Sequence, residues 1–236
     1  MAARGVEFES VNVQDDPGGM ELLQSLGAKT VPVVSVGKKW VFTQTFDDVS
    51  KLLGIDFDDT PQLSPDELAE KVKMIIAGAE RFVRQLPAEQ FDQNVRNRKR
   101  KFKDLCFHIF RLTEAFLDVV IDSDDKLTRE FMNIPCPDHL KSFDEIADYG
   151  NSIGKRFSEW WDTKGEVDFS RIVPTYYGDK ELHYVFERLT WHPGQHARQL
   201  VMLLRDDFDI EPNQPLEDSD FAGLPIPEKA WDGEND

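Results

Sequence analysis

The sequence predicts an α+β protein in which a small α/β module precedes a larger all-α four-helix bundle. Two observations support this prediction. The chain has 236 residues, enough for one large hydrophobic core or two modest ones. The pattern of apolar residues also changes near residue 60, from short alternating stretches to long helical stripes. We therefore expect an α/β module at residues 1–58, a bundle at residues 61–207 and an extended acidic tail containing prolines at residues 208–236.

The first module combines short strand-like and helix-like stretches separated by turn residues. In chain order we expect a strand at 6–13, a helix at 17–26, a hairpin of strands at 31–36 and 40–42, and a helix at 46–53. Gly27 and Gly54 follow the two helices directly, where glycine commonly ends a helix. The hairpin turns around Gly37, whose lack of a side chain suits a tight loop.

Four amphipathic helices are expected in the bundle. Ser64 and Ser142 each precede a glutamate by three residues, the pattern of a capping box at a helix start. Apolar residues then recur at helical spacing, which predicts one buried face on each helix. The helices are expected from Ser64 to Pro87, from Lys101 to Ile121, from Ser142 through Trp160, and from Asp179 through Leu203.

Three of the five histidines have a spacing typical of a metal site. His192 and His196 are four residues apart and share one helix face, and His108 lies on the inner face of an earlier helix. Three nitrogens from two helices leave coordination positions open, as in catalytic metal sites. Zinc is the first expectation, and nickel, iron or manganese also suit histidine ligands. The alternative is that each histidine is a core residue satisfied by a hydrogen bond.

Pro193 and Gly194 stand between two of these ligands, which conflicts with a regular helix. An interior proline removes one backbone hydrogen bond and clashes with the carbonyl of Leu189. The helix is therefore expected either to kink there or to begin afresh at Thr190. Broken local rules beside proposed ligands favour a functional site over a plain core helix.

Composition excludes several classes of partner. The chain has 45 acidic and 28 basic residues and a formal charge of −17, which argues against nucleic acid and anionic membranes as partners. No apolar run approaches the roughly 20 residues of a spanning helix, so a cytoplasmic location is expected. Cys106 and Cys136 form no CxxC motif, in keeping with a reducing compartment. Small molecules are the expected partners, and a homodimer is left open.

A basic run just before the His108 helix interrupts the acidic sequence. One interpretation is a solvated loop, and the other is a clamp for the carboxylate of a thiol or substrate. Its members are Arg96, Arg98, Lys99, Arg100, Lys101 and Lys103. Near the proposed ligands, Tyr184, Gln195 and Gln199 are candidates for supporting contacts. No residue is singled out as catalytic.

The first module resembles a partial glutaredoxin, a family with the thioredoxin fold. The resemblance rests on Thr30-Val31-Pro32, where the family carries a cis-proline loop, and on Asp47 and Asp48, which open the last helix where the family binds the γ-glutamyl end of glutathione. It implies a thiol-binding site at Val31, Pro32, Asp47 and Asp48. The family's first strand and most of its first helix are absent. No cysteine precedes Cys106, so this module cannot carry out thiol–disulfide exchange.

The second region, about residues 61–207, resembles the DinB-like superfamily of metal-binding four-helix bundles. His108, followed by Glu114, and the His192/His196 pair, followed by Arg198 and Gln199, have the order and separation of that superfamily. Its enzymes are typically thiol-dependent transferases and isomerases that use glutathione, mycothiol or bacillithiol with a divalent metal.

A glutaredoxin-like module beside such a bundle points to glutathione among these thiols. The two resemblances together imply a glutathione-dependent metalloenzyme that performs S-transfer or thiol-assisted isomerisation on a small electrophile. Two alternatives stay open. One is a non-enzymatic stress or binding protein with a structural metal, and the other is a metal-dependent hydrolase that uses bound water.

Overall fold

The computed structural model describes residues 7–13, 16–29, 31–42, 46–55, 60–96, 98–121, 127–227 and 230. The chain divides into two compact units, one comprising residues 1–60 with 231–236 and the other comprising Pro61–Ala230. The described part is mostly helical with small antiparallel sheets, which confirms the α+β class. Within it, no helix combines the length and the apolar character that crossing a bilayer requires.

The first unit is built around a β-hairpin and two short helices. Its elements are α1 (Gly19–Ser25), β1 (Val33–Val36), β2 (Lys39–Phe42) and α2 (Phe46–Leu53). The strands pair antiparallel, with Val36 opposite Lys39, so Gly37 opens a tight loop with a φ of 61°. Glycine adopts this left-handed conformation without a Cβ clash. Gly27 and Gly54, beyond the two helices, have φ values of 76° and 66°. The predicted hairpin and both helix ends are therefore confirmed.

The strand predicted at residues 6–13 is wrong for the part of it that is described. Residues 7–13 form no strand, and Val6 lies outside the described residues. A segment with an alternating pattern becomes a strand only when a neighbouring strand forms hydrogen bonds with its backbone. The sheet described in this unit contains β1 and β2 alone. The Asn12 carbonyl instead accepts a hydrogen bond from the Asp16 amide at 2.8 Å, in a turn that leads toward α1.

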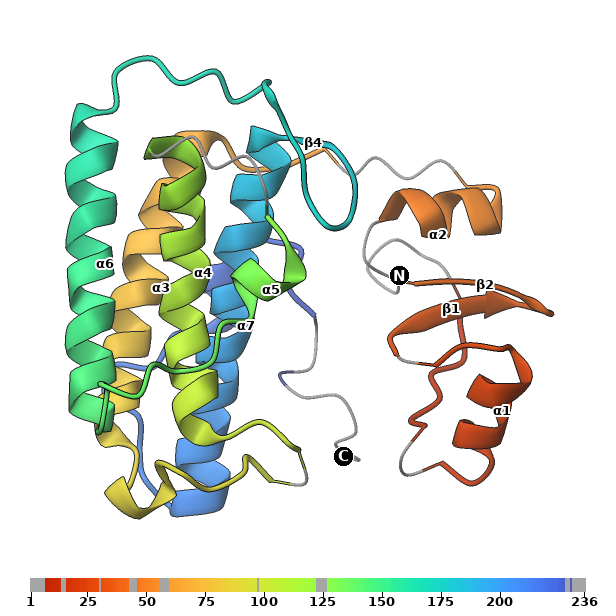
Figure 1. The fold of residues 1–236 in the computed structure, drawn as a ribbon, viewed down its shortest axis with the longest axis horizontal. Helices are drawn as coiled ribbons and strands as arrows, with labels where there is room; N and C mark the ends of the chain where they lie inside the picture. The colour runs from red at the N-terminus through yellow and green to blue at the C-terminus, as the bar shows by residue number, and fades with distance from the viewer. Residues whose placement is uncertain are drawn as a thin grey trace. The chain divides into compact units, whose positions relative to one another are not determined.

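Four long helices form the second unit and run side by side in Figure 1. They are α3 (Pro65–Gln85), α4 (Phe102–Ile121), α6 (Phe143–Thr163) and α7 (Leu182–Phe208). Helices α3 and α4 each pack extensively against both α6 and α7, so the order around the bundle is α3, α6, α4, α7. The shorter elements are η2 (Ala88–Gln90), α5 (Arg129–Met132), β3 (Ile172–Val173), β4 (Lys180–Glu181) and η3 (Asp218–Phe221).

Local sequence explains where the long helices begin. At the start of α3, the Ser64 hydroxyl accepts from the Glu67 amide at 3.3 Å and the Glu67 carboxylate accepts from the Ser64 amide at 2.8 Å, which is the predicted capping box. At the start of α6, the Ser142 hydroxyl accepts from the Glu145 amide at 3.2 Å. The Glu145 carboxylate there accepts from the amide of Lys141.

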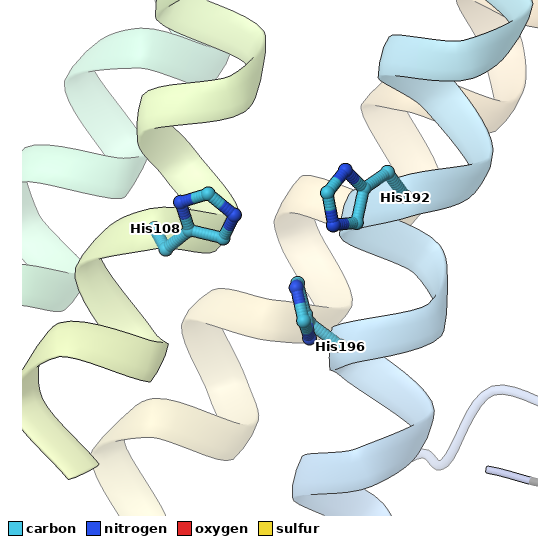
Figure 2. Close-up of side chains that lie close together, drawn as sticks. All are labelled: His108, His192 and His196. Carbon is cyan, nitrogen blue, oxygen red and sulfur yellow. The ribbon is translucent and has the colours of Figure 1, made fainter. Parts of the chain in front are cut away.

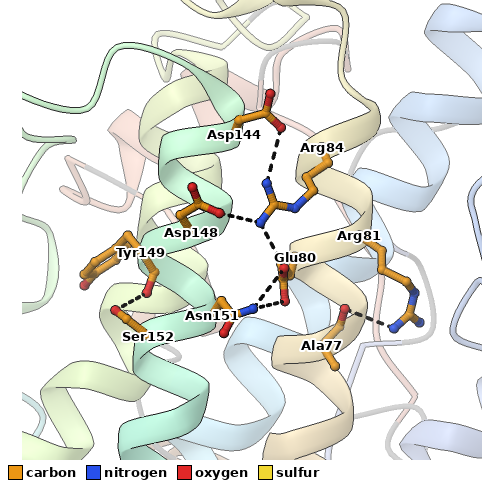
Figure 3. A network of polar contacts seen from close by, with 9 residues as sticks. All are labelled: Ala77, Glu80, Arg81, Arg84, Asp144, Asp148, Tyr149, Asn151 and Ser152. Atoms are coloured by element: carbon orange, nitrogen blue, oxygen red, sulfur yellow. Dashed lines mark hydrogen bonds and ion pairs between the residues drawn. The ribbon is translucent and has the colours of Figure 1, made fainter.

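A polar network on the bundle surface fixes α3 against α6 (Figure 3). The Arg84 guanidinium donates to Glu80 at 3.0 Å on its own helix, and to Asp148 at 2.7 Å and Asp144 at 3.3 Å on α6. Asn151 adds its amide to the Glu80 carboxylate at 3.3 Å. Because these groups are partly solvated, each pair contributes about 1 kcal/mol or less, and the network mainly sets the register of the two helices.

Aromatic pairs hold α4 against α7 on both sides of the histidines. Phe116 of α4 stacks on Phe186 of α7 with ring centroids 4.4 Å apart, and both side chains are fully buried. At the other end of these helices, Phe102 and Phe208 approach to 5.7 Å. His108 lies between these two contacts on α4, and His192 and His196 lie between them on α7. The spacing between the two helices at the histidines is therefore fixed from both ends.

Residues 127–142 run back along the bundle and carry α5 past α4, because α4 ends and α6 begins at opposite ends of the bundle (Figure 1). Arg111 of α4 anchors α5: its Nε donates to the Phe131 carbonyl at 3.3 Å, and its guanidinium lies over the Phe131 ring at 4.4 Å. The sequence did not predict α5, which is only four residues long.

The tail expected at residues 208–236 is part of the second unit as far as it is described. Phe221 and Leu224 are buried, and Ile226 is half-buried. Arg81 of α3 donates to the Gln214 carbonyl at 2.9 Å, which ties the start of the tail to the bundle.

Candidate metal centre

Helix α7 carries two of the proposed ligands on one face. It runs without a break from Leu182 to Phe208 with Pro193 inside it, so the alternative of a helix that begins afresh at Thr190 is wrong. Losing one helical hydrogen bond at proline costs about 3 kcal/mol, which the buried packing along both ends of α7 outweighs. Gly194 lets α7 approach its neighbours closely, since a Cβ there would lie 3.1 Å from Ile75 and 3.2 Å from Phe221.

His108, His192 and His196 converge between α4 and α7, and their rings point toward one another in Figure 2. Ring centroids are separated by 5.4 Å for His108 and His192, 5.3 Å for His108 and His196, and 4.9 Å for His192 and His196. One nitrogen from each ring lies within 4.8 Å of the others. Nitrogens bound to one zinc ion at about 2.1 Å lie about 3.4 Å apart in tetrahedral geometry, so small side-chain rotations would complete the site.

Two nitrogens of this group are buried without a hydrogen-bond partner. They are His108 Nδ1 and His196 Nε2, two of four such side-chain atoms found in the described part of the chain. The remaining nitrogens of these two rings are engaged: His196 Nδ1 lies 2.8 Å from Gln199 Oε1, and His108 has a backbone hydrogen bond at Met132. One nitrogen oriented and the other left open is the pattern of metal-bound histidine. A core histidine would instead be satisfied at both nitrogens.

Burial keeps the three imidazoles neutral. It lowers the pKa of His108 to about 2, with the neighbouring His196 adding to the effect, and lowers the pKa of His196 to about 4. Burial, followed by the two neighbouring histidines, also holds the pKa of His192 well below its usual value near 6.5. Neutral imidazoles present free lone pairs at pH 7, which metal binding requires. This buried group could therefore hold a metal ion.

The basic run before α4 divides into two parts with different surroundings. Arg96 pairs with Asp207 at 2.8 Å, and Lys103 pairs with Asp92 at 2.8 Å, as expected of surface cations. Arg100 is half-buried, and its positive charge acts electrostatically on all three histidines. Burial lowers the pKa of Arg100 while Asp104 partly opposes that change. Arg98 of the same run also acts on His196, so the positive charge of this run favours an anion beside the histidines, and its role as a carboxylate clamp remains a prediction.

The residues proposed as supporting contacts lie in different environments. Gln199 reaches His196, as described above, and Gln195 donates to the Ala230 carbonyl at 2.8 Å. Tyr184, near the start of α7, lies with its ring beside Tyr177 and under the ammonium of Lys180 at 4.7 Å. Sequence reasoning missed the Met132 backbone contact to His108, because nothing in the sequence places α5 against α4.

No thiol or carboxylate joins the histidine group among the residues described. Cys106 is fully buried two residues before His108 and belongs to another face of α4. Burial raises the pKa of Cys106, and burial followed by Asp104 raises the pKa of Cys136 to about 11. Both thiols are therefore protonated at neutral pH and poor nucleophiles. The three histidines alone would leave coordination positions open for water or substrate.

The proposed thiol-binding residues lie in the first unit. The Val31–Pro32 peptide bond is cis, and both residues are exposed just before β1. Asp48 is in the first turn of α2, and the side chain of Asp47 lies outside what is described, as does Thr30. The assignment of Val31, Pro32, Asp47 and Asp48 to thiol binding remains a prediction.

Comparisons with protein-family models, with curated proteins and with solved structures returned no match. The fold and the site define this protein as a helical bundle with a buried three-histidine group that could hold a metal ion.

Proposed function

We propose that this protein is a metal-dependent enzyme that uses a small thiol, glutathione first among them, for S-transfer to or thiol-assisted isomerisation of a small electrophile. The observation that supports it most is the convergence of three neutral histidines, two of which have a buried nitrogen without a hydrogen-bond partner, with no fourth protein ligand among the described residues. Structural zinc sites are normally closed by four protein ligands, so an open group favours catalysis over a structural metal.

A divalent metal bound here would lower the pKa of a coordinated thiol and polarise an adjacent electrophile. The protein contributes three further effects. Burial excludes water around His108 and His196. Gln199 and the Met132 backbone orient two of the rings. Arg100 supplies positive charge that attracts an anionic group such as a carboxylate or thiolate.

The thiol must come from outside the chain. Cys106 and Cys136 are buried and protonated, and the residues preceding them contain no cysteine. A cosubstrate would supply the sulfur that these residues cannot. Its identity as glutathione rests on the resemblance of residues 1–58 to a glutaredoxin. Metal-dependent hydrolysis is the second candidate, because the same open positions suit a water nucleophile.

Parallel assays with two electrophiles distinguish these functions. An activated aryl halide would report S-transfer, in which the thiolate sulfur bonds to carbon and halide leaves, and an activated ester would report hydrolysis. We expect aryl halide turnover that requires both added glutathione and one equivalent of divalent metal. His192→Ala should abolish it, and His139→Ala, at an exposed histidine, should leave it unchanged. Ester turnover that requires metal but no thiol would replace our proposal with the hydrolase, and no turnover with tightly held metal would favour a structural site.

Arg100 provides a second test of the same proposal. Arg100→Gln removes the charge that faces the histidines, so KM for an anionic thiol should rise about tenfold with little change in metal content. The matched control is Lys99→Gln, at an exposed position in the same run. Equal effects of the two substitutions would show that Arg100 has no specific role.

A further inference from the structure

The end of the tail is held by three side chains from one face of α7. The Ala230 carbonyl accepts hydrogen bonds from Gln195 Nε2 at 2.8 Å and from Gln199 Nε2 at 2.9 Å. Arg198 donates to the Pro227 carbonyl at 2.6 Å. These contacts lie next to His196 in the sequence of α7, although the tail is about 30 residues away along the chain.

Gln199 also contacts a proposed ligand. Its Oε1 lies 2.8 Å from Nδ1 of His196 while its Nε2 faces Ala230. A side-chain amide has one end that donates and one that accepts, whereas a backbone carbonyl only accepts. The Ala230 carbonyl therefore fixes which way the amide points, so that Oε1 must face His196.

This orientation determines the tautomer of His196. With an acceptor opposite, Nδ1 must carry the ring hydrogen, which leaves the lone pair on Nε2. Nε2 is the buried nitrogen that has no hydrogen-bond partner. If the amide were free to turn, its NH₂ group could face Nδ1 and favour the opposite tautomer, in which Nε2 carries a hydrogen and cannot bind a metal.

We propose that the backbone carbonyl of Ala230, with Pro227 held nearby by Arg198, sets the tautomer of His196 through Gln199, so that this part of the tail controls metal affinity without contacting the metal. Gln199 is then a positioning residue. This inference rests on the proposed metal site. Partners that orient a metal-bound histidine typically change affinity by about 10- to 100-fold, and we expect an effect at the lower end of that range because the imidazole itself remains.

The test combines truncation of the tail with Gln199→Glu, a substitution that fixes the His196 tautomer without the tail. A chain ending after Pro227 should bind Co²⁺ about tenfold more weakly than the full chain, since Gln199 loses its fixed partner. In Gln199→Glu the carboxylate only accepts hydrogen bonds, so Nδ1 keeps its hydrogen whether or not the tail is present. The same truncation should then change Co²⁺ affinity by about twofold or less. In the full chain, Gln199→Leu should weaken binding about as much as truncation does.

Each result has a distinct meaning. Urea unfolding of the metal-free variants shows whether any loss of affinity follows from loss of folding, and absorbance of bound Co²⁺ reports the coordination directly. Truncation could weaken Co²⁺ binding by the same factor in the chain that retains Gln199 and in the Gln199→Glu variant. That result would overturn the proposal, because the tail would then act without the Gln199 amide. No loss on truncation of the chain that retains Gln199 would overturn it as well. If the full chain binds neither Co²⁺ nor Zn²⁺, the metal site itself fails, which is distinguishable because no affinity is then measurable in any variant.

Discussion

Helix α4 takes part in two partly buried polar clusters whose hydrogen bonding differs. In one, Arg111 pairs with Glu114 at 2.6 Å and with Asp118 at 3.0 Å, and Tyr149 donates to Glu114 at 2.7 Å. In the other, one turn earlier, His108 meets its two partner histidines with nitrogens left open. Because Arg156 also pairs with Asp118, at 3.3 Å, each carboxylate of the first cluster has an arginine partner, as a structural network requires. The second cluster retains nitrogen atoms without a hydrogen-bond partner, which is costly for buried groups unless a ligand such as a metal ion binds them.

The largest expected effect is the loss of metal binding when a histidine of the second cluster is replaced. His192→Ala should lower the affinity for zinc by about 100-fold or more, because only two nitrogens remain, while the free energy of unfolding of the metal-free protein changes by about 1 kcal/mol or less. Elemental analysis of the purified protein and its urea denaturation measure both quantities. His139→Ala is the matched control. Equal metal content in His192→Ala and the unmodified chain would contradict the site.

Arg111→Met tests the structural cluster. It leaves Glu114 without its arginine and Asp118 with Arg156 alone, which should lower the free energy of unfolding by about 1–3 kcal/mol. Metal stoichiometry should stay at one per chain, and metal affinity should fall by less than about tenfold, since Arg111 acts on His108 only through α5. Denaturant melts and metal titration would check this. Loss of metal without loss of stability would reverse the roles given to the two clusters.

Lowering the pH should reduce the free energy of unfolding mainly through the histidine cluster and less through the arginine cluster. The histidines are neutral in the folded chain because their pKa values are depressed, and His196 has a pKa of about 4 against an unfolded value near 6.5. The unfolded chain therefore binds more protons between these values. Above pH 6.5 His196 is neutral in both states and costs the metal-free protein no stability. As the pH drops from 6.5 toward 4, the free energy of unfolding falls by roughly 3 kcal/mol through His196 alone.

Denaturation of the metal-free protein at several pH values measures this loss. His196→Gln should flatten the dependence, because glutamine does not titrate. An unchanged slope in that variant would show that other groups are responsible.

The smallest expected effect is that of Tyr149→Phe. This substitution removes the hydrogen bond that the Tyr149 hydroxyl donates to Glu114. Burial, and after it this hydrogen bond, raises the pKa of Tyr149, so the hydroxyl is protonated and available as a donor. The cost should be about 1 kcal/mol in the free energy of unfolding, with no change in metal affinity. Thermal unfolding with and without zinc gives both values. A change in metal affinity as large as that in stability would mean that the two clusters are coupled.

Local chemistry made much of the bundle predictable. Capping residues such as Ser64, and apolar stripes such as Leu105, Leu112 and Ala115, act within one helix, and these patterns locate all four long helices, although α7 begins at Leu182 and not at the predicted Asp179 because Lys180 and Glu181 form β4. His192 and His196 were predictable for the same reason, because helical spacing alone puts them on one face. That His108 meets them depended on assuming that two separate helices pack together.

The failures involve interactions between segments distant in sequence. Residues 7–13 alternate like a strand, but an alternating pattern does not say whether a partner strand exists. The backbone of Met132 and the carbonyl of Ala230 contact the site through groups that every residue has, so no side-chain pattern could indicate them. The fresh helix start considered near Pro193 does not occur, because tertiary packing outweighs the local penalty of the proline.

The unbroken course of α7 determines how a bound metal would act on the bundle. Two of the three ligands belong to one helix, so backbone hydrogen bonding sets their separation whatever the rest of the protein does. Only His108 depends on how α4 rests against α7. A metal at this site would therefore be a non-covalent cross-link between two helices, and its binding energy would add directly to the resistance of that one helix pair to opening. Hydrogen exchange should show this as slower exchange along α4 and α7 on metal addition, with α6 much less affected.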